Sequence, residues 1–168
     1  AEVIPGALEA VAEFRRMGLK IGSTTGYTGP IMDRLRPLAA AQGYEPDSVS
    51  CSTDVPAGRP APYMIWRCCA EMGVYPMSQV VKIGDTVADI HEGLSAGCWT
   101  IGLTRTGNEL GLSAEDVAAV SGEDLAGRLA AIASEFRAAG AHYVALSLED
   151  CPALLSDIER RLATGEKP

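Results

Sequence analysis

Two aspartates four residues apart follow a short apolar run, and such a pair could hold a metal ion. The run 80–83 ends at Gly84, and Asp85 and Asp89 come after it. The run is typical of a strand buried on both faces, so a helix beginning near Thr86 would leave both carboxylates at the carboxyl end of that strand. Neighbouring carboxylates repel each other, and a hard cation such as Mg²⁺ relieves the repulsion. The alternative is a strand end followed by a solvated first-turn carboxylate that the helix dipole favours.

Hydroxyl groups end an earlier segment that also reads as a strand. Thr24 and Thr25 end the predicted strand 19–25, Gly26 follows it, and a helix capped by Thr28 is expected next. Hydroxyls and backbone N–H groups just before a helix are good ligands for a phosphoryl group. The alternative is an ordinary polar turn that leads into a helix cap.

An arginine between glycine and proline is the third candidate. Pro60 holds Arg59 extended, and Gly58 lets the backbone approach a ligand closely. A permanently charged guanidinium at such a place suits an oxyanion. The alternative is a solvated loop arginine.

Strands and helices alternate along the chain with short connections. This pattern predicts an α/β, Rossmann-like fold with a mostly parallel sheet and helices on both faces. The order begins with a helix, so the first strand of such a sheet is missing or lies outside this chain. Pro37 predicts a kink or early stop in its helix, and Ser113 with Asp116 resembles a capping box. Expected helices are 5–17, 28–43, 62–73, 86–96, 124–139 and 152–162, and expected strands are 19–25, 49–52, 80–84, 98–103 and 142–146.

Composition limits the classes of partner. The 168 residues suit one domain, and the net charge of −8 makes nucleic acid and anionic membranes poor partners. A small anionic substrate stays open, because a metal and one or two arginines can reverse the local field. No apolar run approaches the roughly 18 residues of a membrane span, and no signal peptide is visible. Five irregularly spaced cysteines indicate buried, reduced thiols in a cytoplasmic protein.

The three candidate segments together resemble the haloacid dehalogenase superfamily. In that superfamily a strand-end Ser or Thr, a basic residue and a paired acidic motif complete a Mg²⁺-dependent phosphoryl-transfer site. Within it, the chain is similar to the phosphonatase family, whose members hydrolyse the P–C bond of phosphonoacetaldehyde to acetaldehyde and phosphate. The similarity extends from Pro5 to about Ile158. It is carried by the runs KIGSTTGYT, DVPAGRPAPYM, GVYP, KIGDTVADIHEG and NELGL.

The resemblance implies a role for each candidate residue. Thr25 and Arg59 would be catalytic: the Thr25 hydroxyl binds a phosphoryl oxygen beside Thr24 and the Gly26 backbone, and Arg59 balances charge on the phosphonate and on an acyl-phosphate intermediate. Asp85 would bind Mg²⁺, and Asp89 would support the metal directly or through water. Residues 1–168 would form one haloacid dehalogenase-like core domain, and the family implies a homodimer that acts on a small phosphonate.

The sequence also departs from the family. The family's nucleophilic aspartate lies in a D-x-x-G-T type motif, which is absent here, and none of Lys20, Lys82 and Lys167 suits the family's Schiff-base lysine. These departures, the missing first strand and the absence of an initial methionine together predict that this chain is the C-terminal part of the enzyme. It would lack the first strand and the cap domain. The alternatives are a related phosphatase for a small phosphate ester and a catalytically incomplete fragment that only binds anions.

Overall fold

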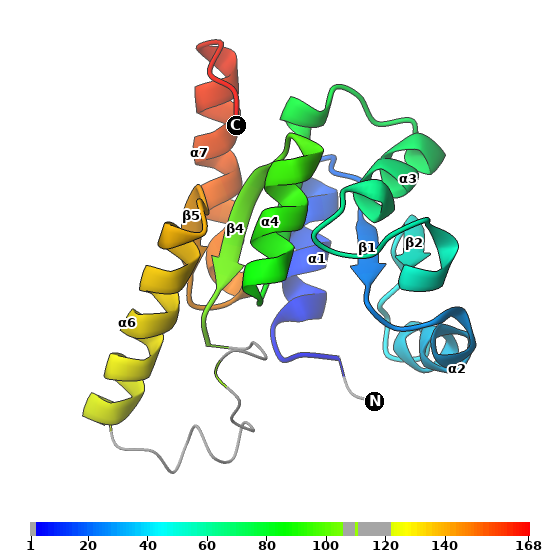
Figure 1. The fold of residues 1–168 in the computed structure, drawn as a ribbon, viewed down its shortest axis with the longest axis horizontal. Helices are drawn as coiled ribbons and strands as arrows, with labels where there is room; N and C mark the ends of the chain where they lie inside the picture. The colour runs from blue at the N-terminus through cyan, green and yellow to red at the C-terminus, as the bar shows by residue number, and fades with distance from the viewer. Residues whose placement is uncertain (1–2, 106–109, 111–121) are drawn as a thin grey trace.

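The computed structural model describes residues 3–105, 110 and 122–168. Helices and strands alternate along this part of the chain, as Figure 1 shows. The helices are α1 (Ala7–Arg16), α2 (Gly29–Ala40), α3 (Tyr63–Met72), α4 (Val87–Ala96), α6 (Gly122–Ala138) and α7 (Cys151–Ala163). The strands are β1 (Gly22–Thr25), β2 (Ser48–Cys51), β3 (Val81–Gly84), β4 (Trp99–Leu103) and β5 (Tyr143–Ala145).

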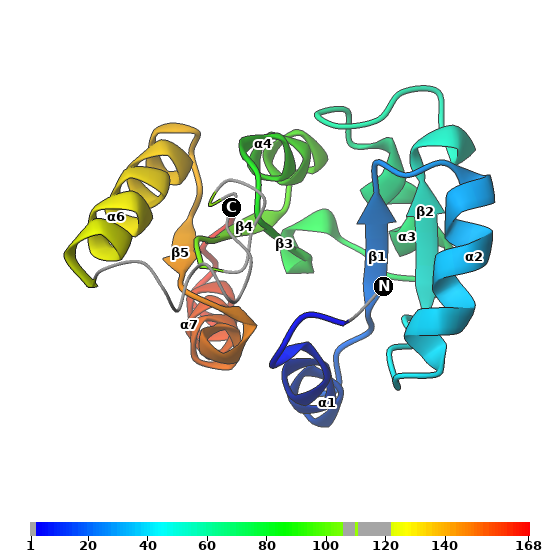
Figure 2. The same ribbon diagram turned by 90° about the horizontal axis from the view of Figure 1, so that it is seen from below.

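All strand pairs in the described part of the chain are parallel, which confirms the predicted α/β class. The strands form two sheets, β1-β2 and β3-β4-β5, where the alternation had predicted one. Figure 2 shows β3 on the side of β1 that faces away from β2, and β1 and β3 do not pair with each other. The polar ends of β1 and β3 lie at the same edge of the molecule, although no backbone hydrogen bonds join the two strands in the described part of the chain.

Strand β4 is the centre of the larger sheet. Every residue of β4 is buried, as expected for a parallel strand covered on both faces. Trp99, Ile101 and Leu103 pack with residues of α1 and α7 in one apolar cluster. On the opposite face a Cβ added at Gly102 would lie 2.4 Å from the Phe136 ring, so α6 approaches this strand closely. Figure 2 shows α4 and α6 on one side of the strands and α1 and α7 on the other.

Helix α2 differs from its prediction. It contains Pro37 and continues to Ala40, so the early stop predicted at this proline is wrong. Thr28 occupies the predicted cap position, but its side chain makes no capping hydrogen bond. The predicted capping box at Ser113 and Asp116 lies outside the described residues.

The cysteine and membrane predictions can be compared with the structure directly. All five cysteines are free thiols and buried. None of the helices in the described ranges has the length and apolar character that crossing a bilayer would need.

Candidate functional site

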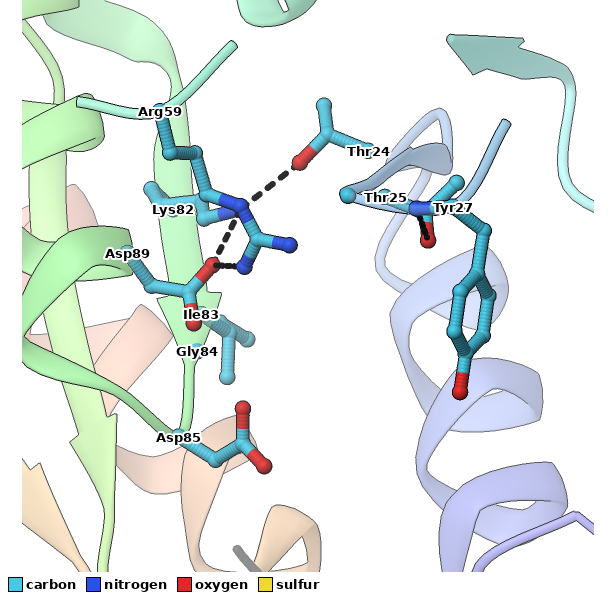
Figure 3. Close-up of a pocket in the computed structure, with 10 residues that line it drawn as sticks. Thr24, Thr25, Tyr27, Arg59, Lys82, Ile83, Gly84, Asp85 and Asp89 are labelled. Atoms are coloured by element: carbon cyan, nitrogen blue, oxygen red, sulfur yellow. Dashed lines mark hydrogen bonds and ion pairs between the residues drawn. The ribbon is translucent and has the colours of Figure 1, made fainter. Parts of the chain in front are cut away.

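A pocket of about 440 Å³ lies between the carboxyl ends of β1 and β3. Parallel sheets commonly bind ligands at this edge, and the volume is within the usual range for small-molecule sites. The structure brings together the side chains of all three candidate segments here, as Figure 3 shows. The pocket is lined by Thr24, Thr25, Gly26, Tyr27, Arg59, Lys82, Ile83, Gly84, Asp85 and Asp89.

The turn after β1 presents the Thr25 hydroxyl group, whose oxygen already accepts one hydrogen bond. The Tyr27 N–H donates to Thr25 Oγ1 at 3.1 Å, so the Thr25 O–H proton can be donated to a ligand oxygen. Ser52, the residue after β2, supports this turn because its Oγ donates to the Gly26 carbonyl at 2.9 Å. A Cβ added at Gly26 would lie 3.1 Å from Arg59 Nη2, so the glycine allows the guanidinium to come close to this backbone.

Arg59 reaches the pocket from the loop before α3. Its Nη1 lies 2.5 Å from Asp89 Oδ1, and its side chain is 23% exposed. A charge-assisted contact of this kind holds one end of the guanidinium beside Asp89. Because Nη2 borders Gly26, one side chain spans the pocket from α4 to the turn after β1.

Asp89 lies in the first turn of α4 and is almost completely buried. Its Oδ2 accepts hydrogen bonds from Thr86 N and Thr86 Oγ1, and its Oδ1 faces Arg59 and Lys82. Burial raises the pKa of Asp89, but the charge of Lys82, the Thr86 hydrogen bond and the charge of Arg59 outweigh it, so the pKa lies below its ordinary value. The capping box of Thr86 and Asp89 starts the helix at the predicted place.

Gly84 is required for this arrangement. A Cβ added there would lie 2.2 Å from the Asp89 Cβ, a separation that no packed structure tolerates. The Gly-Asp step therefore lets the first turn of α4 fold back against the end of β3.

Asp85 follows β3 directly, and its carboxylate points into the pocket in Figure 3. Among the described residues no three His, Cys, Asp or Glu side chains gather closely enough to hold a metal ion. Mg²⁺ commonly takes one or two protein carboxylates and completes its shell with water and phosphate oxygens. Asp85 fits such a partial donor set, whereas Asp89 already accepts from four donor atoms.

Sequence reasoning missed a buried part of the site. Lys82 lines the pocket and contacts Thr24, Asp89 and Glu92, and Glu92 is completely buried in α4. Thr24 was predicted as a phosphoryl ligand, but its hydroxyl accepts from Lys82 and donates to Glu92. A lysine inside a buried strand was a usable signal, because a buried ammonium needs carboxylate partners.

The chain was compared with known proteins. A sequence model described as haloacid dehalogenase-like hydrolase matches residues 1–97. Two proteins of Syntrophobacter fumaroxidans are similar over all 168 residues: a phosphonoacetaldehyde hydrolase-like protein at 57% identity and a phosphonoacetaldehyde hydrolase at 51%. The chain spans 61% of the length of each.

A solved structure agrees in fold. The crystal structure of a phosphonoacetaldehyde hydrolase-like protein from Oleispira antarctica superposes with a TM-score of 0.96 at 39% identity, covering 99% of this chain and 60% of that one. The fold, the grouping of the candidate residues at one sheet edge and the match over more than half of the chain agree with one another. The chain belongs to the haloacid dehalogenase-like hydrolases.

Proposed function

We propose that this chain is the phosphoryl-binding and metal-binding part of an enzyme that hydrolyses phosphonoacetaldehyde. In the overall reaction water breaks the P–C bond: the phosphorus gains the oxygen as phosphate, and the carbon gains a proton to give acetaldehyde. The observation that carries the proposal is the guanidinium of Arg59 beside Gly26, next to the Thr25 hydroxyl. The similarity to proteins with the name phosphonoacetaldehyde hydrolase supports this substrate over other phosphoryl compounds.

Each group at the turn has a task in this proposal. The Thr25 O–H and the Gly26 N–H donate to oxygens of the phosphonate. Arg59 places positive charge where negative charge increases during transfer, and it does so without reorganising, because Asp89 holds it.

Mg²⁺ would be held by Asp85, with Asp89 acting through water or through the side chains it orients. The ion would supply positive charge to the phosphoryl oxygens and to the attacking carboxylate. The remaining ligands would come from water, the substrate and groups outside the described residues.

The nucleophilic aspartate and the Schiff-base lysine are proposed to lie in the part of the protein that this chain does not span. The Lys20 ammonium donates to the Met72 carbonyl at 2.6 Å, and Lys82 is enclosed by three acceptors. An imine matters here because direct P–C cleavage expels a poor carbanion, which the imine converts to an enamine. We place the missing strand, with the aspartate at its end, between β1 and β3.

The remaining proposals rest on the resemblance. Residues 1–168 form one haloacid dehalogenase-like core domain, and the full-length protein is a homodimer in the cytoplasm. Sedimentation of the full-length protein tests the dimer.

The decisive experiment uses the full-length protein with phosphonoacetaldehyde, following acetaldehyde with a coupled NADH-dependent reductase and phosphate in parallel. We expect equal amounts of both products, loss of turnover with EDTA and recovery with MgCl₂. We expect no turnover by the 168-residue chain alone. Phosphate release from a panel of phosphate monoesters, with no acetaldehyde from the phosphonate, would instead identify a phosphatase.

A further inference from the structure

The ammonium group of Lys82 is enclosed between the two sheets. It donates to Thr24 Oγ1 at 2.7 Å, and it lies 2.8 Å from Glu92 Oε2 and 3.0 Å from Asp89 Oδ1. An ammonium has three protons, so these three acceptors satisfy it completely. The Lys82 side chain is only 10% exposed and the Glu92 side chain is not exposed at all.

We infer that Lys82 and Glu92 are positioning residues that hold the turn after β1 in register with the first turn of α4. The inference rests on the proposed function, because the aligned groups are those of the proposed phosphoryl site. Neither residue is proposed to touch the substrate. Lys82 acts through Thr24, which directly precedes Thr25, and through Asp89, which orients Arg59.

The cluster connects side chains of two strands that do not pair with each other in the described part of the chain. β1 pairs with β2 and β3 pairs with β4 in the described part of the chain, and the strand proposed above would lie between β1 and β3 in the full-length protein. The contact between Lys82 of β3 and Thr24 of β1 joins these strands directly. Thr24 also donates to Glu92 Oε2 at 3.3 Å, which closes a ring of three side chains from β1, β3 and α4.

The charges in the cluster balance. Lys82 and Arg59 face Asp89 and Glu92, so two cations are matched by two carboxylates. Removing Lys82 alone would leave a buried carboxylate without its cation, and removing Glu92 alone would leave excess positive charge. Either single change would disturb folding as well as the site.

Stability alone is a weak reason to keep this pair. Buried ion pairs can often be replaced by apolar residues of similar volume without loss of stability. Glu92 Oε1 is buried and has no hydrogen-bond partner among the described residues, which is a further unfavourable feature. A role in alignment explains why the chain places two opposite charges here.

The test is a double variant, Lys82→Met with Glu92→Leu, in the full-length protein. Binding of inorganic phosphate in excess MgCl₂ is measured by calorimetry, and stability by urea unfolding. We expect stability close to the wild type and phosphate affinity reduced about tenfold. The matched control removes the exposed Arg16–Glu13 pair of α1 by Arg16→Met with Glu13→Leu, and it should bind like the wild type.

A second pair of variants isolates the alignment step. Thr24→Val removes the hydroxyl that Lys82 contacts and should weaken phosphate binding, whereas Thr24→Ser keeps the hydroxyl and should recover most of the affinity. Thr24→Val added to the double variant should cause little further loss, since the three groups act as one unit.

Each outcome is decisive. If the double variant folds and binds phosphate as tightly as the wild type, the inference is wrong and the proposed function stands. If the wild type binds no phosphate, the proposed phosphoryl site fails and the inference fails with it. Loss of stability without loss of affinity, or equal affinities of the two Thr24 variants, would show a purely structural cluster.

Discussion

Arg59 Nη1 lies 2.5 Å from Asp89 Oδ1, which joins the loop before α3 to the first turn of α4. The same guanidinium borders Gly26 through Nη2. The paired acidic motif therefore orients the cation that faces the turn after β1. Two segments that the sequence placed at separate strand ends act as one electrostatic unit.

Arg59→Lys is predicted to weaken phosphate binding although it keeps the charge. A lysine ammonium is a point charge on a flexible stem, and it lacks the two separate NH2 groups with which the guanidinium contacts Asp89 and faces Gly26. We expect about a tenfold loss in affinity, equivalent to about 1.4 kcal/mol. Calorimetry with inorganic phosphate measures it. Arg67→Lys on α3, outside the pocket lining, is the control, and equal affinities of the two variants would mean that charge alone matters.

Gly84→Ala is predicted to displace Asp89. The new Cβ would lie 2.2 Å from the Asp89 Cβ, so the first turn of α4 must shift away from β3. We expect a loss of about 2 kcal/mol in the free energy of unfolding, typical of overpacking, together with weaker phosphate binding. Urea unfolding and calorimetry measure the two effects.

Gly127→Ala is the matched control for Gly84→Ala. Gly127 lies inside α6, and a Cβ added there meets nothing within 4 Å. Because alanine favours a helix over glycine, this variant should be as stable as the wild type or up to about 1 kcal/mol more stable. If both alanine variants behave alike, the close approach of Asp89 to Gly84 is not what requires the glycine.

The sequence predicted several helix ends well because local interactions determine them. The Thr86–Asp89 capping box begins α4, and Gly73 and Gly97, which have left-handed backbone angles, end α3 and α4. All of these interactions involve residues close together in the sequence. The edge shared by Thr25 and Asp85 followed from parallel alternation, which places all strand carboxyl ends together.

The division into two sheets and the buried cluster could not be predicted in the same way. Pairing between β1 and β3 depends on what lies between them, which no local pattern records. From the sequence, Glu92 is indistinguishable from an ordinary carboxylate on a helix. Its role depends on the contact with Lys82, which joins β3 to α4 in three dimensions. The early stop predicted at Pro37 is wrong, because α2 continues for three residues beyond it to Ala40.

The five cysteines are predicted to be unreactive in the folded protein. All are buried, and burial raises the pKa of each thiol, to about 12 for Cys98 and for Cys151. Because the thiolate is the reactive form, an aromatic disulfide reagent at pH 8 should label none in the native state and all five in urea. Rapid labelling of one thiol before unfolding would contradict this prediction and identify an accessible cysteine.

His142 is predicted to make stability depend on pH between about 7 and 5. Its Nδ1 accepts from the Thr100 N–H at 3.1 Å, which requires the neutral ring. Burial lowers the pKa of His142, and the positive charge of Arg161 lowers it further. Below the ordinary value of about 6.5 the unfolded chain therefore binds more protons than the folded chain, and the free energy of unfolding falls as the pH falls.

Urea unfolding of two glutamine variants at pH 7 and pH 5 tests the role of His142. His142→Gln keeps a hydrogen-bond acceptor near Thr100 but does not titrate, so it should lose less stability between the two pH values than the wild type does. His91→Gln is the matched control, because His91 is exposed and its variant should keep the wild-type dependence. The pKa of Asp89 is lowered from about 3.8, so its contribution is lost only as the pH falls below about 4, outside this interval. An unchanged pH dependence in His142→Gln would show that the proton linkage lies elsewhere.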